Sequence, residues 1–199
     1  MGPLSTSINF GKDKTIPPRE RILAVAADLF YRHGIKPVGV EAIAEAAGTN
    51  KMTLYRHFAS KDELVAEYLL RLAKEGDTLW DRLEAKYPGD CRSQLRAWLN
   101  EMAKHVGAGD DRGCALANAA IELAEKDHPA RRVIEACKCA QRDRLIKLCR
   151  DAGLSEPELL ADELFLILEG ARVTAQSMGP EGPSARLVRM GEVLIASHA

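Results

Sequence analysis

The chain has 199 residues, 46% of them hydrophobic and 5% aromatic, and a formal net charge of −1 at pH 7. This length fits one domain, or a small domain joined to a larger one, with enough apolar residues for a buried core. No run approaches the roughly 18 uninterrupted apolar residues of a membrane-spanning helix, and the start lacks a signal-peptide stretch. We therefore expect a cytoplasmic protein without a membrane partner and with a flexible tail over residues 1–16.

Cysteine usage argues against a disulfide framework. The five cysteines are odd in number, have no regular spacing and fit a reducing compartment. Cys137 and Cys139 lie two positions apart on a predicted helix, so they point away from each other and cannot share one metal ion. Because the chain has no Cys-x-x-Cys motif and no His-rich cluster, we expect neither a metal nor a cofactor.

Apolar residues recur at helical spacing through nearly the whole chain, and no run shows the strict alternation of a strand. The sequence therefore predicts an all-α fold of about nine helices. Asn50 is the expected cap of the third helix, and Ser60 with Glu63 forms a capping box for the fourth. A second capping box, Ser155 with Glu158, is expected for the eighth. The predicted helices cover residues 18–33, 40–46, 51–58, 60–86, 91–106, 114–126, 129–152, 155–178 and 184–197.

Residues 49–58, TNKMTLYRHF, carry basic and titratable side chains but no acid. They belong to the basic front of the chain. Residues 1–60 hold eight Lys/Arg and five Asp/Glu, a balance of +3, whereas the remaining residues have a balance of −4. The predicted helices before and after Gly48 are short, and Ala44 and Ala47 are small enough to let them cross closely. This layout is that of a helix-turn-helix, whose second helix enters the DNA major groove.

In this arrangement Leu54 and Phe58 face inward, and the polar side chains of the second helix face outward. Arg and Lys donate to guanine, Thr bonds to either kind of base edge, and a thioether contacts a thymine methyl group. A basic helix that is merely solvated would have the same charge. The glycine, the small residues and the apolar pair favour the DNA-binding interpretation. The predicted outward residues are Lys51, Met52, Thr53, Tyr55 and Arg56, with His57 at the edge.

The segment RERILAVAADLFYRHG…VEAIAEAAGTNKMTLYRHFASKDEL resembles the amino-terminal DNA-binding domain of the tetracycline-repressor (TetR) family of bacterial transcriptional regulators. The resemblance covers about residues 18–65. It includes Phe30, His33 and Gly34 at the end of the first helix, and the stretches IAEAAG and LYRHF. Two positions depart from the family pattern. Gly39 replaces a capping Ser or Thr, and Met52 replaces a frequent Gly, so the operator sequence cannot be taken from a relative.

The resemblance implies a DNA-binding domain over residues 17–65 and an effector-binding and dimerisation domain over residues 66–199. It implies a homodimer that binds double-stranded operator DNA and is released as a repressor by a small-molecule effector. Lys51, Met52, Thr53, Tyr55 and His57 are the implied DNA contacts, and Lys61 the implied phosphate contact.

The effector cannot be identified from the sequence. Several residues lie on helices that surround the pocket in the family, although core packing competes for Trp98 and Met102, and the polar ones could simply face solvent. The segment RGCALANAAIEL at residues 112–123 looks like a common segment of the family core, which favours Cys114 as a small buried residue rather than a reactive one. The candidate effector residues are Trp98, Met102, Asn118, Glu122, Phe165, Arg172 and Gln176.

The last two predicted helices have apolar surfaces wider than one face, so they need burial on several sides. A second subunit could supply this burial, and the alternative is that both helices form the centre of the monomer core. The candidate interface residues are Leu164, Phe165, Leu168, Ala171, Leu187, Met190 and Leu194.

Other functional classes have weaker support. A redox- or metal-responsive regulator that uses cysteines is one alternative. An all-helical enzyme is another, although the chain has no phosphate loop, His-Glu-x-x-His motif or nucleophile elbow, so we expect no catalysis. A helix-turn-helix that binds protein instead of DNA is the third.

Overall fold

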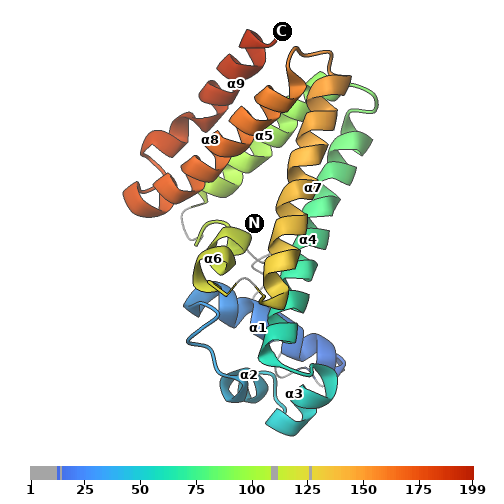
Figure 1. Ribbon diagram of the computed structural model, residues 1–199, viewed down its shortest axis with the longest axis vertical. Helices are drawn as coiled ribbons and strands as arrows, with labels where there is room; N and C mark the ends of the chain where they lie inside the picture. Colours follow the sequence, from blue (N-terminus) through green and yellow to red (C-terminus); the bar gives the residue numbers. More distant parts are fainter. Residues whose placement is uncertain (1–12, 14, 109–111, 126) are drawn as a thin grey trace. The chain divides into compact units, whose positions relative to one another are not determined.

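The computed structural model describes residues 13, 15–108, 112–125 and 127–199. Most of the predicted tail therefore lies outside the described residues. In the described part of the chain the regular elements are all helical, which confirms the all-α prediction (Figure 1). They are α1 (Pro18–His33), α2 (Val40–Ala46), α3 (Lys51–His57), α4 (Lys61–Lys86), α5 (Cys91–Gly107), α6 (Ala115–Glu122), α7 (Pro129–Asp151), α8 (Pro157–Met178), the 3-10 helix η1 (Pro183–Arg186) and α9 (Leu187–Ser197).

The chain divides into two compact units. Unit 1 joins Met1–Lys74 with Ala115–Glu135, and unit 2 joins Glu75–Cys114 with Ala136–Ala199. Helices α4 and α7 each begin in unit 1 and continue into unit 2. The predicted functional boundary after residue 65 stays a prediction.

In unit 1, α1, α2 and α3 pack around a small apolar core. Ile22, Ile43 and Leu54 are completely buried, one from each helix. Phe30 of α1 packs against Tyr68 of α4, with ring centroids 5.7 Å apart. The core fixes the mutual position of these helices, and α2 and α3, with 7 residues each, are too short to be stable alone.

Local capping sets the helix ends of unit 1 as predicted. The Asn50 side chain accepts a hydrogen bond of 2.9 Å from the amide of Thr53 at the start of α3. The Ser60 hydroxyl accepts one of 3.0 Å from the amide of Glu63, whose carboxylate bonds back to the amide of Ala59. Gly48 lies between α2 and α3 with φ +62°, a value that favours glycine.

In unit 2, α5 packs against α8 and α9, and the later parts of α4 and α7 complete the core. Trp80 stacks on Trp98 with ring centroids 6.2 Å apart. Helices α5 and α9 approach closely at Gly191, where a Cβ atom would lie 2.4 Å from Leu99 Cδ2.

Two details of the predicted elements are wrong. Helix α6 ends at Glu122 instead of continuing to residue 126, which itself lies outside the described residues. The second capping box does not form, because the Ser155 hydroxyl donates to the carbonyl of His198 at 2.9 Å and Glu156 adopts φ +46°. The described helices include none that is both long and apolar enough to cross a membrane.

The predicted dimer-interface residues fall mostly inside the core of unit 2. Leu164, Leu168, Ala171 and Leu187 are buried there, as expected from the alternative in which both helices form the centre of the monomer core. Phe165 and Leu194 are half-buried against the same core, whereas Met190 is 51% exposed. Hydrophobic periodicity identified the apolar helices but did not separate their inward faces from their outward faces.

Candidate nucleic-acid interface

A buried arginine and a tight turn position α2 relative to α1 and α3. The guanidinium of Arg21 in α1 donates to the carbonyl of Ala47 at 3.1 Å and to that of Ile16 at 2.9 Å. The amide of Thr49 donates to the carbonyl of Ala44 at 2.9 Å and closes the turn. The bonds to Ala47 and Ala44 satisfy carbonyls at the end of α2 that have no partner within the helix, whereas the bond to Ile16 joins Arg21 to the segment before α1. Arg21 was missed by the sequence analysis because its polarity predicts exposure.

Two apolar side chains anchor α3, as the sequence predicted. Leu54 and Phe58 are buried, and the guanidinium of Arg19 lies over the Phe58 ring at 5.0 Å from its centroid. Because these residues are four positions apart, they hold one side of α3 against the core and leave the other side outward.

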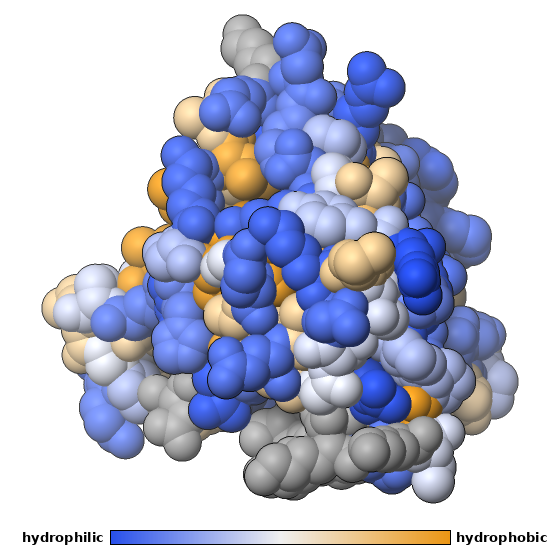
Figure 2. All heavy atoms as spheres, turned by 90° about the horizontal axis from the view of Figure 1, so that it is seen from below, coloured by the Kyte–Doolittle hydropathy of each residue, from blue (hydrophilic) through white to orange (hydrophobic). Residues whose placement is uncertain are grey.

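The six residues of α3 other than Leu54 are all at least partly exposed. Lys51, Met52, Tyr55, Arg56 and His57 are exposed and Thr53 is half-buried. Met52 is 71% exposed. Figure 2 shows one face of the molecule, and its visible surface is mostly hydrophilic.

Lys51 is paired with an acid from the preceding helix. Its ammonium group donates to Glu41 of α2 at 2.5 Å. This hydrogen bond raises the pKa of Lys51 and lowers that of Glu41. Both side chains are exposed, so the pair contributes little to stability, and Lys51 can exchange Glu41 for another anion.

The side chain of Lys61 contacts other residues of unit 1. Its Nζ donates to the carbonyl of Lys36 at 3.3 Å and lies 6.0 Å from the centroid of the Phe30 ring. Burial lowers its pKa. A phosphate contact from Lys61 therefore requires its side chain to turn away from this position.

Glu122 at the end of α6 binds the loop between α1 and α2. Its carboxylate accepts hydrogen bonds from the amides of Ile35 at 2.6 Å and Lys36 at 3.1 Å. Gly34, with φ +90°, allows the approach, since a Cβ atom there would lie 3.0 Å from the carboxylate. Glu122 was predicted from the sequence as an effector contact, whereas in the structure its carboxylate connects α6 to the loop before α2.

The chain was compared with known proteins. A solved TetR transcriptional regulator from Streptomyces avermitilis is 32% identical and superimposes with a TM-score of 0.77, over 92% of this chain and 98% of that one. The chain belongs to the TetR family. The model of bacterial regulatory proteins of the tetR family matches residues 22–68, which include α2 and α3. A TetR-family regulator from Streptomyces coelicolor gives a TM-score of 0.85 at 26% identity, over 91% of this chain and 95% of that one.

A curated relative, the HTH-type transcriptional regulator AcrR of Shigella flexneri, is 34% identical over 88 residues. The match covers 44% of this chain and only 41% of AcrR, so the chain spans less than half of that relative. The comparisons establish a transcriptional regulator of the TetR family, a class whose role is not enzymatic.

Most candidate effector residues of this TetR-family chain lie in unit 2. Trp98 stacks on Trp80 in the core. Gln176 lies so close to Gly113 that a Cβ atom on this glycine would be 2.4 Å from its Nε2. Asn118 is half-buried on α6, which, like Glu122, belongs to unit 1.

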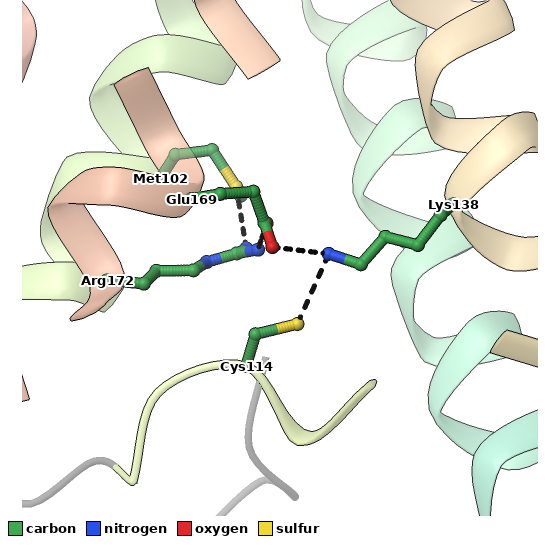
Figure 3. Close-up of polar contacts among 5 residues, drawn as sticks. All are labelled: Met102, Cys114, Lys138, Glu169 and Arg172. Atoms are coloured by element: carbon green, nitrogen blue, oxygen red, sulfur yellow. Dashed lines mark hydrogen bonds and ion pairs between the residues drawn. The ribbon is translucent and has the colours of Figure 1, made fainter. Parts of the chain in front are cut away.

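Met102 and Arg172 meet at a polar cluster in unit 2 (Figure 3), and the Phe165 ring centroid lies 5.2 Å from Nζ of Lys138 in the same cluster. Lys138 donates to Glu169 at 2.8 Å, and Arg172 donates to the other oxygen of the same carboxylate at 2.6 Å. Lys138 and Glu169 were not predicted from the sequence as site residues. Their only sequence signal was the Glu169–Arg172 spacing of three, which places two charges on one face of an apolar helix.

The described residues contain no group of three or more His, Cys, Asp or Glu side chains arranged to hold a metal ion. The cysteines are free thiols in the structure, and Cys114 and Cys149 are buried.

Proposed function

We propose that this TetR-family chain is a homodimeric repressor that binds operator DNA through α3 and is released by a small-molecule effector. The observation that carries the proposal is the rigid mounting of α3. Leu54 and Phe58 fix one side of the helix, and the other side presents a cation, a hydroxyl and an exposed thioether to solvent. This surface has the groups that the major groove accepts.

In the proposed complex the outward residues of α3 divide into those that contact bases and those that contact phosphates. Arg56 and Thr53 contact base edges, and Met52 provides an apolar contact for thymine. Tyr55 and Lys51 contact phosphates, with Lys51 leaving Glu41 for the DNA backbone. The remaining proposed contacts are made by His57 and Lys61.

The exposed apolar stripe on α8 supports a homodimer. Leu159, Leu166 and Val173 recur every seven residues, which places them on one side of the helix, and the latter two are 69% and 63% exposed. On α9, Met190 and Val193 are exposed at a spacing of three. Burial of these side chains against a second copy removes apolar surface from water, which favours association. These residues replace the buried ones first assigned to the interface.

The proposed effector response connects unit 2 with α3 through continuous elements. Helices α4 and α7 contain residues of both units, and α6 follows Cys114 directly in the chain. Glu122 of α6 holds the loop that leads into α2. An effector that changes the position of these helices alters DNA affinity, and DNA must then alter effector affinity by the same factor.

The test of DNA binding is selection of duplexes from a random pool, followed by fluorescence anisotropy. A homodimer is expected to enrich an inverted repeat with half-sites about 10 base pairs apart, or a multiple of that spacing. Arg56→Ala should weaken binding to the selected duplex by about 1–3 kcal/mol, and it should relax the base preference of the protein at one position of the site. Arg150→Ala is the matched control, because Arg150 is exposed in unit 2 and pairs with Glu158. Absence of any enriched sequence would overturn the proposal.

Sedimentation velocity tests the dimer separately. Val173→Glu places a charge in the proposed interface and should shift the protein toward the monomer. Ile121→Glu is the control, since Ile121 is an exposed apolar residue of α6 in unit 1. Equal sedimentation of both variants and the unaltered chain would exclude this surface as the interface.

A further inference from the structure

An acid from the preceding helix reaches the basic side of α3. Residues 49–58 contain no acid of their own, but Glu41 of α2 accepts a hydrogen bond from the ammonium group of Lys51 at 2.5 Å. The two side chains are 67% and 53% exposed, so both are open to a partner in solution. Nζ of Lys51 also lies 6.0 Å from the centroid of the Tyr55 ring. In the free protein, therefore, the first cation of α3 is already bound to an anion.

Both members of this pair are charged at neutral pH. The hydrogen bond from Lys51, followed by a backbone hydrogen bond of Glu41 itself, lowers the pKa of the Glu41 carboxyl group. The same hydrogen bond from the side of Glu41 raises the pKa of Lys51. The contact is thus an ion pair, and its carboxylate is an oxygen anion of the kind that a DNA phosphate would present to the same ammonium group.

We propose that Glu41 is a built-in competitor of DNA, which occupies the ammonium group of Lys51 in the free protein and thereby lowers the affinity for duplexes of every sequence. This inference rests on the proposed function, in which Lys51 contacts the DNA backbone. It assigns a role to an acidic residue of α2, outside the helix that reads the bases.

The competition costs affinity whichever way the pair responds to DNA. If Lys51 moves to a phosphate, Glu41 loses its partner and stays close to a polyanion that repels it. If the pair stays closed, one phosphate contact is missing. Glu41 takes no part in the proposed base contacts of Arg56 and Thr53, so the cost falls on the sequence-independent part of binding. A lower sequence-independent affinity leaves the base contacts to decide which sites are occupied.

Glu41→Gln removes the charge and keeps the size of the side chain. In fluorescence anisotropy at low salt, this variant should bind the selected duplex and a scrambled duplex more tightly by the same factor. We expect a gain on the order of two- to fivefold for each subunit that contacts DNA, the usual range for an exposed ion pair. The plot of log affinity against log salt should also be steeper, by up to about 0.9 for each subunit, because one more phosphate is neutralised.

Glu45→Gln is the matched control, because Glu45 is an exposed acid of the same helix and its replacement changes the net charge equally. Its gain in affinity should be smaller than that of Glu41→Gln. Equal gains from the two variants would overturn the proposal. So would a change of base preference in Glu41→Gln, since a competitor for the DNA backbone acts on all sequences alike.

A double-mutant cycle with Lys51→Gln tests whether the effect passes through Lys51. The gain from Glu41→Gln should largely disappear when Lys51 is already replaced, because the competitor then has no cation to occupy. The smaller gain from Glu45→Gln should persist in that background. A Glu41→Gln gain that remains in full without Lys51 would overturn the proposal.

The pair itself is measured in the free protein, without DNA. In an NMR titration of the Glu41 carboxyl carbon, the pKa should be higher in Lys51→Gln than in the unaltered chain, because the hydrogen bond that lowers it is lost. Lys147→Gln, at an exposed lysine that pairs with Asp151, should leave the pKa of Glu41 unchanged. Equal Glu41 pKa values in the two lysine variants would overturn the proposal whether or not the chain binds DNA. A chain that binds no duplex in any variant would contradict the proposed function, and the titration would still decide the pairing.

Discussion

The outward surface of α3 and the polar cluster of unit 2, which includes Cys114, are assembled in different ways. The first takes its side chains from one run of seven residues, and local caps and an apolar pair orient them. The second joins α5, the residue before α6, α7 and α8, and its members are up to 70 positions apart in the sequence. A contiguous surface depends on one helix being anchored, whereas a dispersed cluster depends on the packing of the whole unit.

The largest effect should come from removing the anchor of α3. Leu54→Ala deletes most of a completely buried side chain and should destabilise unit 1 by about 2–5 kcal/mol. Chemical denaturation monitored by circular dichroism measures this change. Met52→Ala on the exposed side of the same helix should leave stability within about 0.5 kcal/mol. Similar stabilities of the two variants would show that α3 is not held as described.

A smaller effect should follow from Glu122→Ala, which tests a long-range contact within unit 1. The amides of Ile35 and Lys36 lose their acceptor, at a cost of about 1–3 kcal/mol. Hydrogen exchange at these two amides should become faster. Glu125→Ala, at an exposed residue of the same region, is the control. Unchanged exchange in the Glu122 variant would contradict the proposed connection between α6 and the helix-turn-helix.

The smallest effect concerns the charges of unit 2 and depends on pH. Burial acts to raise the pKa of Glu169, but Arg172 and Lys138 outweigh it, and the pKa lies below its usual value. A lowered carboxylate pKa adds stability above the unfolded value of about 4.3, and this stability is lost as pH falls through the folded value. Thermal unfolding between pH 6 and pH 3 should therefore show a weaker pH dependence in Glu169→Gln than in the control Glu181→Gln. Identical profiles would mean that Glu169 is not held by these cations.

The sequence predicted the first region well because its signals are local. Apolar spacing, Asn50 and Gly48 indicated α3, its cap and the preceding turn, and the structure has all three. The family resemblance was read from the same contiguous stretch, and the comparisons confirm the family. The DNA contacts themselves stay a proposal.

The rest depends on tertiary packing that no local pattern encodes. The role of Glu122 depends on the loop at residues 34–36, which is remote in the sequence and lies at its carboxylate in the fold. The apolar period of α8 was visible, but both faces carry leucines, so the sequence did not separate the face buried in unit 2 from the exposed face. Lys138 is an ordinary charged residue in the sequence, and only the fold places it between Glu169 and Cys114.

Hydrogen–deuterium exchange of the full chain, with and without a selected duplex, tests most directly whether α3 is the DNA-reading element. The account predicts that DNA slows exchange in residues 50–57, which the surrounding core holds but does not cover on the outward side. Protection of other segments with none in residues 50–57 would contradict it.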